Sequence, residues 1–138
     1  MDHYDTPQDA AMVGSPPQHC RVVGVRIDGD EAYVLLDAGS GNQRYLYGVN
    51  CARERAGWRE GSSGNGGGWS LTDAAGDLGT WSLWDEAPAG ADAVRVEYDD
   101  VASEHPVHEG IYLVVWFRRP LDPAPRVTGF RIAGRWQP

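Results

Sequence analysis

The segment Val94–Phe117, VRVEYDDVASEHPVHEGIYLVVWF, decides the fold class of this chain. In its first five residues apolar and charged side chains alternate, which is the pattern of a β-strand with one face in a core and the other in solvent. Its last seven residues, Ile111–Phe117, are apolar on both faces, so we expect them to form a central strand. Asp99 and Asp100 lie between these runs, and turns favour aspartate. The segment therefore predicts antiparallel β-structure.

Short β-branched and aromatic runs continue this pattern over most of the chain. Residues 21–27 and 31–36 flank Asp28–Asp30, a strong hairpin signal because its central glycine tolerates the positive φ of tight turns. A third run, 44–51, completes a predicted meander. No window has a sustained apolar period of about 3.6 residues, so helix should be minor or absent. About seven to nine short strands predict an all-β antiparallel β-sandwich, with an immunoglobulin-like topology as one form of it and a small closed β-barrel as the alternative.

The length of 138 residues is that of one domain. Residues 1–18 are polar and rich in proline, so we predict a flexible N-terminal lead-in, followed by a single β-sandwich domain over residues 19–138. We predict no signal peptide, because no basic segment precedes an apolar run. No stretch reaches the about 20 apolar residues of a membrane span. A cytoplasmic location is the expectation, and secretion stays open as an alternative.

The charge of the chain is negative and unevenly distributed. The net charge is −8, which argues against nucleic acid as a partner because phosphate binding needs clustered cations. Residues 60–109 hold eleven acidic residues and one arginine, whereas residues 110–138 hold five arginines and one aspartate. All twelve basic residues are arginine, so phosphate loops and Schiff-base chemistry that need lysine are excluded. We expect either a solvated acidic face or a surface that selects a basic partner.

The glycine-rich segment Gly61–Gly68, GSSGNGGG, is the most unusual local feature. Its backbone entropy opposes regular structure, so we predict a loop. This loop is either a plain flexible connection between two strands or a ligand-contacting loop with Trp58 and Trp69 beside it as aromatic walls. Trp81 and Trp84 are three residues apart, so on a strand they face opposite sides and one of them should be outside the core. The candidate binding residues are Trp58, Ser62, Ser63, Asn65, Trp69 and Trp84.

The sequence predicts no catalytic residue, no metal ligand and no cofactor. Cys20 and Cys51 are expected to be buried thiols, with a disulfide between them as the alternative. His105 and His108 are three residues apart, and on an extended strand such residues face opposite sides and do not chelate one ion.

These observations favour a non-enzymatic binding domain, most simply for a protein partner. A carbohydrate-binding module with a tryptophan platform is the first alternative. A small hydrolase or metal-dependent enzyme that uses Cys51 or the histidine pair is the second. Neither nucleic acid nor a membrane is expected as a partner, and the oligomeric state stays open.

Several segments resemble one group of proteins. Beside Val94–Phe117, these are VTGFRIAGRW at 127–136, SSGNGGGW at 62–69 and LGTWSLW at 78–84. Together they cover about half of the chain and resemble small actinobacterial β-proteins of uncharacterised function. The resemblance implies an all-β fold and an actinobacterial source, and it brings no catalytic residues.

Overall fold

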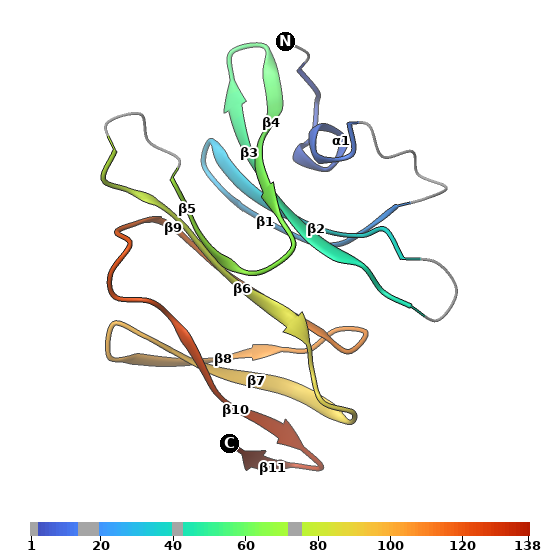
Figure 1. The fold of residues 1–138 in the computed structure, drawn as a ribbon, viewed down its shortest axis with the longest axis vertical. Helices are drawn as coiled ribbons and strands as arrows, with labels where there is room; N and C mark the ends of the chain where they lie inside the picture. Colours follow the sequence, from blue (N-terminus) through green and yellow to red (C-terminus); the bar gives the residue numbers. More distant parts are fainter. Residues whose placement is uncertain (1–2, 14–19, 40–42, 72–75) are drawn as a thin grey trace. The chain divides into compact units, whose positions relative to one another are not determined.

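The structure, a computed structural model, describes residues 3–13, 20–39, 43–71 and 76–138 (Figure 1). These residues form eleven strands, all paired antiparallel, and one helix of five residues. The predicted all-β antiparallel class is confirmed. The sequence predicted one domain over residues 19–138. By the contacts within the chain, two compact units are distinguished, Met1–Gly66 and Gly67–Pro138.

Unit 1 is built on a four-stranded meander. The strands are β1 (Arg21–Asp28), β2 (Glu31–Asp37), β3 (Leu46–Glu54) and β4 (Gly57–Gly64), and they lie in this order across the sheet. Gly29 has φ +61° in the predicted turn between β1 and β2. The second predicted turn falls partly on residues 40–42, which lie outside the described residues. The predicted three-stranded meander is confirmed, and β4 extends it.

A short helix, α1 (Pro7–Ala11), packs on one face of this meander. Ala32 and Val34 of β2 stand directly opposite Cys51 and Val49 of β3, so these four side chains share one face of the sheet. Ala10 of the helix is fully buried against this cluster, and Trp58 of β4 completes the core.

The buried helix lies within residues 1–18, for which a flexible lead-in was predicted, and residues 1–2 and 14–18 of that stretch lie outside the described residues. Thr6 caps it, accepting a hydrogen bond on Oγ1 from the Asp9 N–H at 3.1 Å, and Pro7 occupies the first turn, where its missing N–H costs nothing. Tyr4 exchanges two backbone hydrogen bonds of 2.8 and 2.7 Å with Trp58, so the N-terminal segment runs alongside β4. A helix of five residues is too short to give a periodic signal, which is why the sequence pattern missed it.

Unit 2 is a two-sheet sandwich. One sheet has the order β5 (Gly68–Leu71), β6 (Gly79–Glu86), β9 (Ile111–Arg119). The other has the order β11 (Arg135–Gln137), β10 (Arg126–Ile132), β7 (Ala91–Tyr98), β8 (Val101–Pro106). Val94 and Val96 of β7 pack against Tyr112 and Val114 of β9 between the sheets. The inward alternation predicted for residues 94–98 is confirmed.

The position of β9 corrects one prediction. Ile111–Phe117 was expected to be a central strand, yet among the described strands β9 pairs only with β6 and forms the end of its sheet. Its first four residues are buried, between 5% and 7% exposed. Apolar side chains on both sides of a strand report burial of both faces, and they do not report whether both edges are paired.

Candidate functional site

The predicted binding residues are divided between the two units. Trp58, Ser62, Ser63 and Asn65 lie in unit 1, and Trp69 and Trp84 lie in unit 2.

The glycine-rich segment is not a loop over its whole length, which corrects that prediction for Gly61–Gly64 and Gly68, and only residues 65–67 connect the two strands. β4 continues to Gly64, with Ser63 opposite Val49 of β3, and β5 begins at Gly68. The register shifts at Asn50, whose Nδ2 donates to Ser62 Oγ at 3.2 Å. A Cβ at Gly61 would lie 3.1 Å from the Asn50 carbonyl oxygen. Glycine at position 61 permits the close approach of β3 and β4, and the hydrogen bonds between these strands offset the entropic cost of ordering the glycine backbone.

Two of the predicted tryptophans have no open ring face. Trp58 is 5% exposed, and the Arg53 guanidinium lies 5.4 Å from its ring centroid. Trp84 is 6% exposed. A stacking platform needs accessible rings, so neither residue serves as one. Ser62, Ser63 and Asn65 are exposed.

Trp69 belongs to a row of three tryptophans in unit 2. It stands directly opposite Trp81 of β6, which stands opposite Trp116 of β9, so the three share one side of the sheet. Trp69 Nε1 donates to the Arg119 carbonyl oxygen at 3.0 Å, and Trp81 Nε1 donates to that of Pro120 at 2.9 Å. These two indoles fix the backbone where β9 ends.

The two cysteines are buried and free, as predicted. Cys51 Sγ donates to the Pro7 carbonyl oxygen at 3.6 Å. Burial, with a smaller contribution from the charge of Glu60, raises the pKa of the Cys51 thiol to about 12. The nucleophilic thiolate is thus absent at neutral pH. The Cys20 sulfur lies 3.4 Å from the Tyr47 hydroxyl.

A pocket of about 220 Å³ opens in unit 2 between the β7–β8 hairpin and the end of β9, and we call it the β8–β9 pocket. It is lined by Tyr98, Asp99, Val101, Ser103, Trp116 and Arg119. The rings of Tyr98 and Trp116 are tilted by 45° with centroids 5.1 Å apart. The Arg119 guanidinium lies 5.7 Å from the Tyr98 centroid. The pocket therefore combines an aromatic wall with a cation.

Two backbone irregularities build this pocket. Asp99 and Asp100 have φ of 51° and 65°, the left-handed pair of a type I′ turn that closes the β7–β8 hairpin. Near the end of β9, an extra residue shifts the register: Trp116 pairs with Trp81, whereas Arg119 pairs with Gly79. Gly79 and Trp81 share one side of β6, so this bulge turns Arg119 to the side of Trp116. Regular alternation would have turned it away.

One cation of the pocket, Arg119, has no ion pair among the described residues. Burial raises the pKa of Tyr98, Arg119 opposes that shift and Asp99 adds to it, so the phenol stays neutral at physiological pH. Arg119 makes no ion pair within the part of the chain that the structure describes, and it is exposed at the pocket rim. Asp99 also lines the pocket, and no ion pair joins it to Arg119 among the described residues, so the guanidinium can receive a carboxylate from outside the chain.

Ser103 also connects the pocket to a histidine. Its Oγ lies 2.8 Å from Nε2 of His105, two residues along β8 and on the same side of the strand. A hydroxyl within hydrogen-bond reach of an imidazole is the minimal arrangement for a serine nucleophile and its base.

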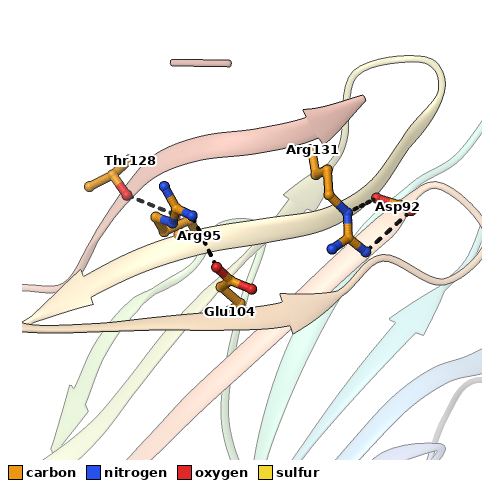
Figure 2. Close-up of polar contacts among 5 residues, drawn as sticks. All are labelled: Asp92, Arg95, Glu104, Thr128 and Arg131. Carbon is orange, nitrogen blue, oxygen red and sulfur yellow. Dashed lines mark hydrogen bonds and ion pairs between the residues drawn. The ribbon is translucent and has the colours of Figure 1, made fainter. Parts of the chain in front are cut away.

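Three arginines on the other face of the β7 sheet form ion pairs. Figure 2 shows Arg131 donating to both carboxylate oxygens of Asp92, at 2.8 and 3.3 Å, and Arg95 donating to Glu104 at 3.0 Å. Arg126 pairs with Glu97 at 3.0 Å. Trp136 lies against this row, with the Arg95 guanidinium 4.1 Å from its ring.

These pairs change the meaning of the uneven charge. Two of these ion pairs, Arg126–Glu97 and Arg131–Asp92, join the two sequence segments, and the third, Arg95–Glu104, lies within the acidic segment, so part of the contrast between the segments cancels in space. The acidic face predicted for residues 60–109 is therefore partly neutralised within unit 2.

Comparison with protein-family models, with curated proteins and with solved structures finds no match. The resemblance to small actinobacterial β-proteins stays a prediction. In the described ranges, no helix is long and apolar enough to cross a bilayer. No group of three or more His, Cys, Asp or Glu side chains forms a metal-binding arrangement among residues 3–13, 20–39, 43–71 and 76–138.

Sequence reasoning missed Tyr98, Trp116 and Arg119 as site residues. The signal that could have found the first was the Asp99–Asp100 pair, because a two-residue turn places Tyr98 opposite Val101 at the hairpin end. The bulge that turns Arg119 inward has no signature in the sequence, since Arg118 with φ 54° is not a residue that favours this conformation.

Proposed function

We propose that this chain is a non-enzymatic binding protein that holds a side chain of a protein partner in the β8–β9 pocket. One observation carries the proposal: the pocket places Trp116 and Tyr98 beside an arginine that has no ion pair in the described structure. Trp, Tyr and Arg are the residue types that dominate binding energy at protein interfaces, and they do so in pockets. This site replaces the surface around the glycine-rich segment as our leading candidate.

The size of the pocket supports a side chain as its occupant. Pockets for small-molecule ligands usually measure about 300–1,000 Å³, whereas this one measures about 220 Å³. A single side chain fills such a volume, with the rest of the partner resting on the surrounding surface. A carbohydrate-binding platform is less well supported, because Trp58 and Trp84 are buried.

We also propose that unit 2 has an immunoglobulin-like topology. Its seven strands divide into a sheet of the first, second and fifth strands and a sheet of the seventh, sixth, third and fourth. Two antiparallel sheets that share a core and exchange strands in this way support the proposal. Such domains are common carriers of binding sites on scaffolds without catalytic groups.

The test is affinity capture from a lysate of the source organism with wild type, Arg119→Glu and Arg135→Glu. The second variant makes the same charge change at an exposed position of β11 outside the pocket. We expect at least one partner that wild type and Arg135→Glu retain and Arg119→Glu loses. Identical sets of captured proteins from all three would refute the proposed site.

Ester hydrolysis is a second candidate, favoured by the 2.8 Å contact between Ser103 and His105 beside the pocket. Ser103 Oγ would attack the ester carbonyl while His105 takes its proton and passes it to the leaving alkoxide. Water would then release the acyl group by the same route. Labelling with a fluorophosphonate that is lost in Ser103→Ala and kept in Ser63→Ala would support hydrolysis. Absence of labelling in wild type would eliminate it.

A further inference from the structure

We propose that an extended segment of the partner adds as a strand to the free edge of β8 and inserts an aspartate or glutamate side chain into the β8–β9 pocket, against Arg119. This inference rests on the proposed function and specifies the partner's conformation and the chemistry of its anchoring residue. Its support comes from the hydrogen-bond register of β8, the direction of its side chains and the arginine of the pocket that has no ion pair in the described structure.

The register of β8 leaves backbone groups facing outward. The Val107 N–H donates to the Asp92 carbonyl oxygen at 3.0 Å, and bonds to the partner strand recur at every second residue of an antiparallel pair. Val101, Ser103 and His105 are therefore the residues bonded to β7. Ala102 and Glu104 direct their N–H and C=O groups to the opposite edge, where no described strand pairs with β8. Pro106, which has no N–H, occupies one of these outward positions, as expected.

This edge is accessible. Ala102 and Glu104 are exposed, and Val101 is 65% exposed, which is unusual for an apolar residue on a strand. Sheet edges are commonly protected by charged side chains that reach over them. Here the carboxylate of Glu104 is instead held by Arg95 at 3.0 Å, on the face of the sheet shown in Figure 2. Two consecutive outward positions are thus open to an added strand.

An added strand would point alternate side chains at the pocket. Residues directly opposite each other in antiparallel strands share a face, so a segment residue opposite Ser103 lies on the same side as Ser103. That side carries Val101 and Ser103, both of which line the pocket. The neighbours of this residue bond to Ala102 and Glu104 and point their side chains away. Main-chain bonds would give affinity, and the pocket would select one side chain.

The pocket selects a carboxylate. Its lining holds one cation, Arg119, and one acidic residue, Asp99, and no ion pair joins the two among the described residues. The Arg119 guanidinium, 5.7 Å from the Tyr98 ring centroid, is therefore left without a carboxylate partner in the described structure. A carboxylate can bond the guanidinium, and it can also accept from the Ser103 hydroxyl when His105 Nε2 carries a proton and donates to that hydroxyl. A lysine or arginine side chain would meet Arg119 as a like charge.

Four fluorescein-labelled heptapeptides test the inference by fluorescence anisotropy with the full chain. The parent is threonine–valine–threonine–glutamate–threonine–valine–threonine, blocked at both ends, and a second peptide has glutamine at the centre. A third carries N-methyl groups on the two threonines next to the glutamate, whose N–H groups would face β8. A fourth is N-methylated at the glutamate, whose N–H would face away.

We expect the glutamine peptide to bind about tenfold more weakly than the parent, because it loses a charge-assisted contact. The peptide with two N-methyl groups should lose at least tenfold, since each lost main-chain bond contributes about two- to tenfold. The peptide N-methylated at the glutamate should bind within about threefold of the parent. On binding the parent, the amide protons of Ala102 and Glu104 should shift in NMR spectra more than those of Val101 and Ser103.

A variant tests the same contact from the side of the protein. Ala102→Pro removes one outward N–H without removing a bond to β7, whereas Ala102→Ser keeps it. We expect the proline variant to bind the parent peptide at least fivefold more weakly than the serine variant. If Ala102→Pro does not fold, the N-methylated peptides carry the test alone.

The outcomes separate the inference from the proposed function. Equal binding of the parent and the doubly N-methylated peptide would overturn strand addition, and the capture test of Arg119 would still decide the pocket. Equal binding of the glutamate and glutamine peptides would overturn the carboxylate anchor. Failure of wild type to bind the parent at millimolar concentration would overturn the inference as a whole. Loss of both the capture difference and peptide binding would refute the function as well.

Discussion

The pH dependence of stability should reveal how Cys51 is buried beneath α1. The thiol is 5% exposed and donates to Pro7, and burial raises its pKa from 9.0 to about 12. In the unfolded chain the thiol ionises near pH 9, whereas the folded protein keeps it protonated up to about pH 12. The stabilisation is therefore fully present below pH 9 and is lost as the pH rises toward 12.

The magnitude follows from this shift. Each pKa unit corresponds to about 1.4 kcal/mol, so the complete loss is about 4 kcal/mol. The pH of 10.5 lies about 1.5 units above the pKa of the thiol in the unfolded chain, so ionisation stabilises the unfolded state there. It lowers the free energy of unfolding by about 2 kcal/mol relative to pH 8.

Urea denaturation of wild type and Cys51→Ala at pH 8 and pH 10.5 measures this contribution. The alanine variant should be less stable at pH 8 because it loses buried volume, and its own decrease in stability up to pH 10.5 should be smaller by about 2 kcal/mol. Tyrosines titrate in both proteins, so the difference isolates the thiol. Equal decreases in the two proteins would mean that Cys51 ionises in the folded state and that α1 does not shield it.

Three further substitutions, one of them with a matched control, test packing or a turn within one unit each. Ala10→Asp places a charge at a fully buried position of α1 and should lower the free energy of unfolding by at least about 3 kcal/mol, measured by urea denaturation; a change below 1 kcal/mol would contradict the buried helix. Gly79→Ala should cost about 2 kcal/mol or more, because its Cβ would lie 2.6 Å from the Trp69 ring, whereas Gly66→Ala meets nothing within 4 Å and should change stability by less than about 1 kcal/mol. Ala133→Asn should raise the melting temperature by about 2–4 °C, because Ala133 has φ 53° in the β10–β11 turn and asparagine tolerates this conformation better; an unchanged or lower melting temperature would count against that turn.

Local chemistry explains which parts of the fold were predictable. The alternation in residues 94–98 and the turn at Asp28–Asp30 each depend on neighbouring residues, and both predictions match the structure. The conformation of the glycine-rich segment was not predictable in this way, because it depends on pairing with β3 and on the hydrogen bond from Asn50. The energy of a strand ladder comes from the neighbouring strand, so composition alone underestimates it.

The candidate site was less predictable than the fold. Trp58 and Trp84 were selected as large exposed aromatics, but tryptophan supplies as much core volume as binding surface, and both are buried. The pocket that the structure contains requires a type I′ turn at Asp99 and a bulge before Arg119 at the same end of unit 2. The sheet topology brings this turn and this bulge to the same end of unit 2, and no single stretch of the sequence predicts that they meet.

Site-specific photocrosslinking tests most directly whether the β8–β9 pocket is the binding surface. Benzoylphenylalanine would replace Val101, which lines the pocket and is 65% exposed, or Ile27, which is an apolar residue of unit 1 that is 55% exposed. After irradiation in a lysate of the source organism, the probe at position 101 should yield a discrete protein adduct, and mass spectrometry should locate the link next to an aspartate or glutamate of the partner. The same adduct from position 27, or none from position 101, would contradict the assignment of the pocket.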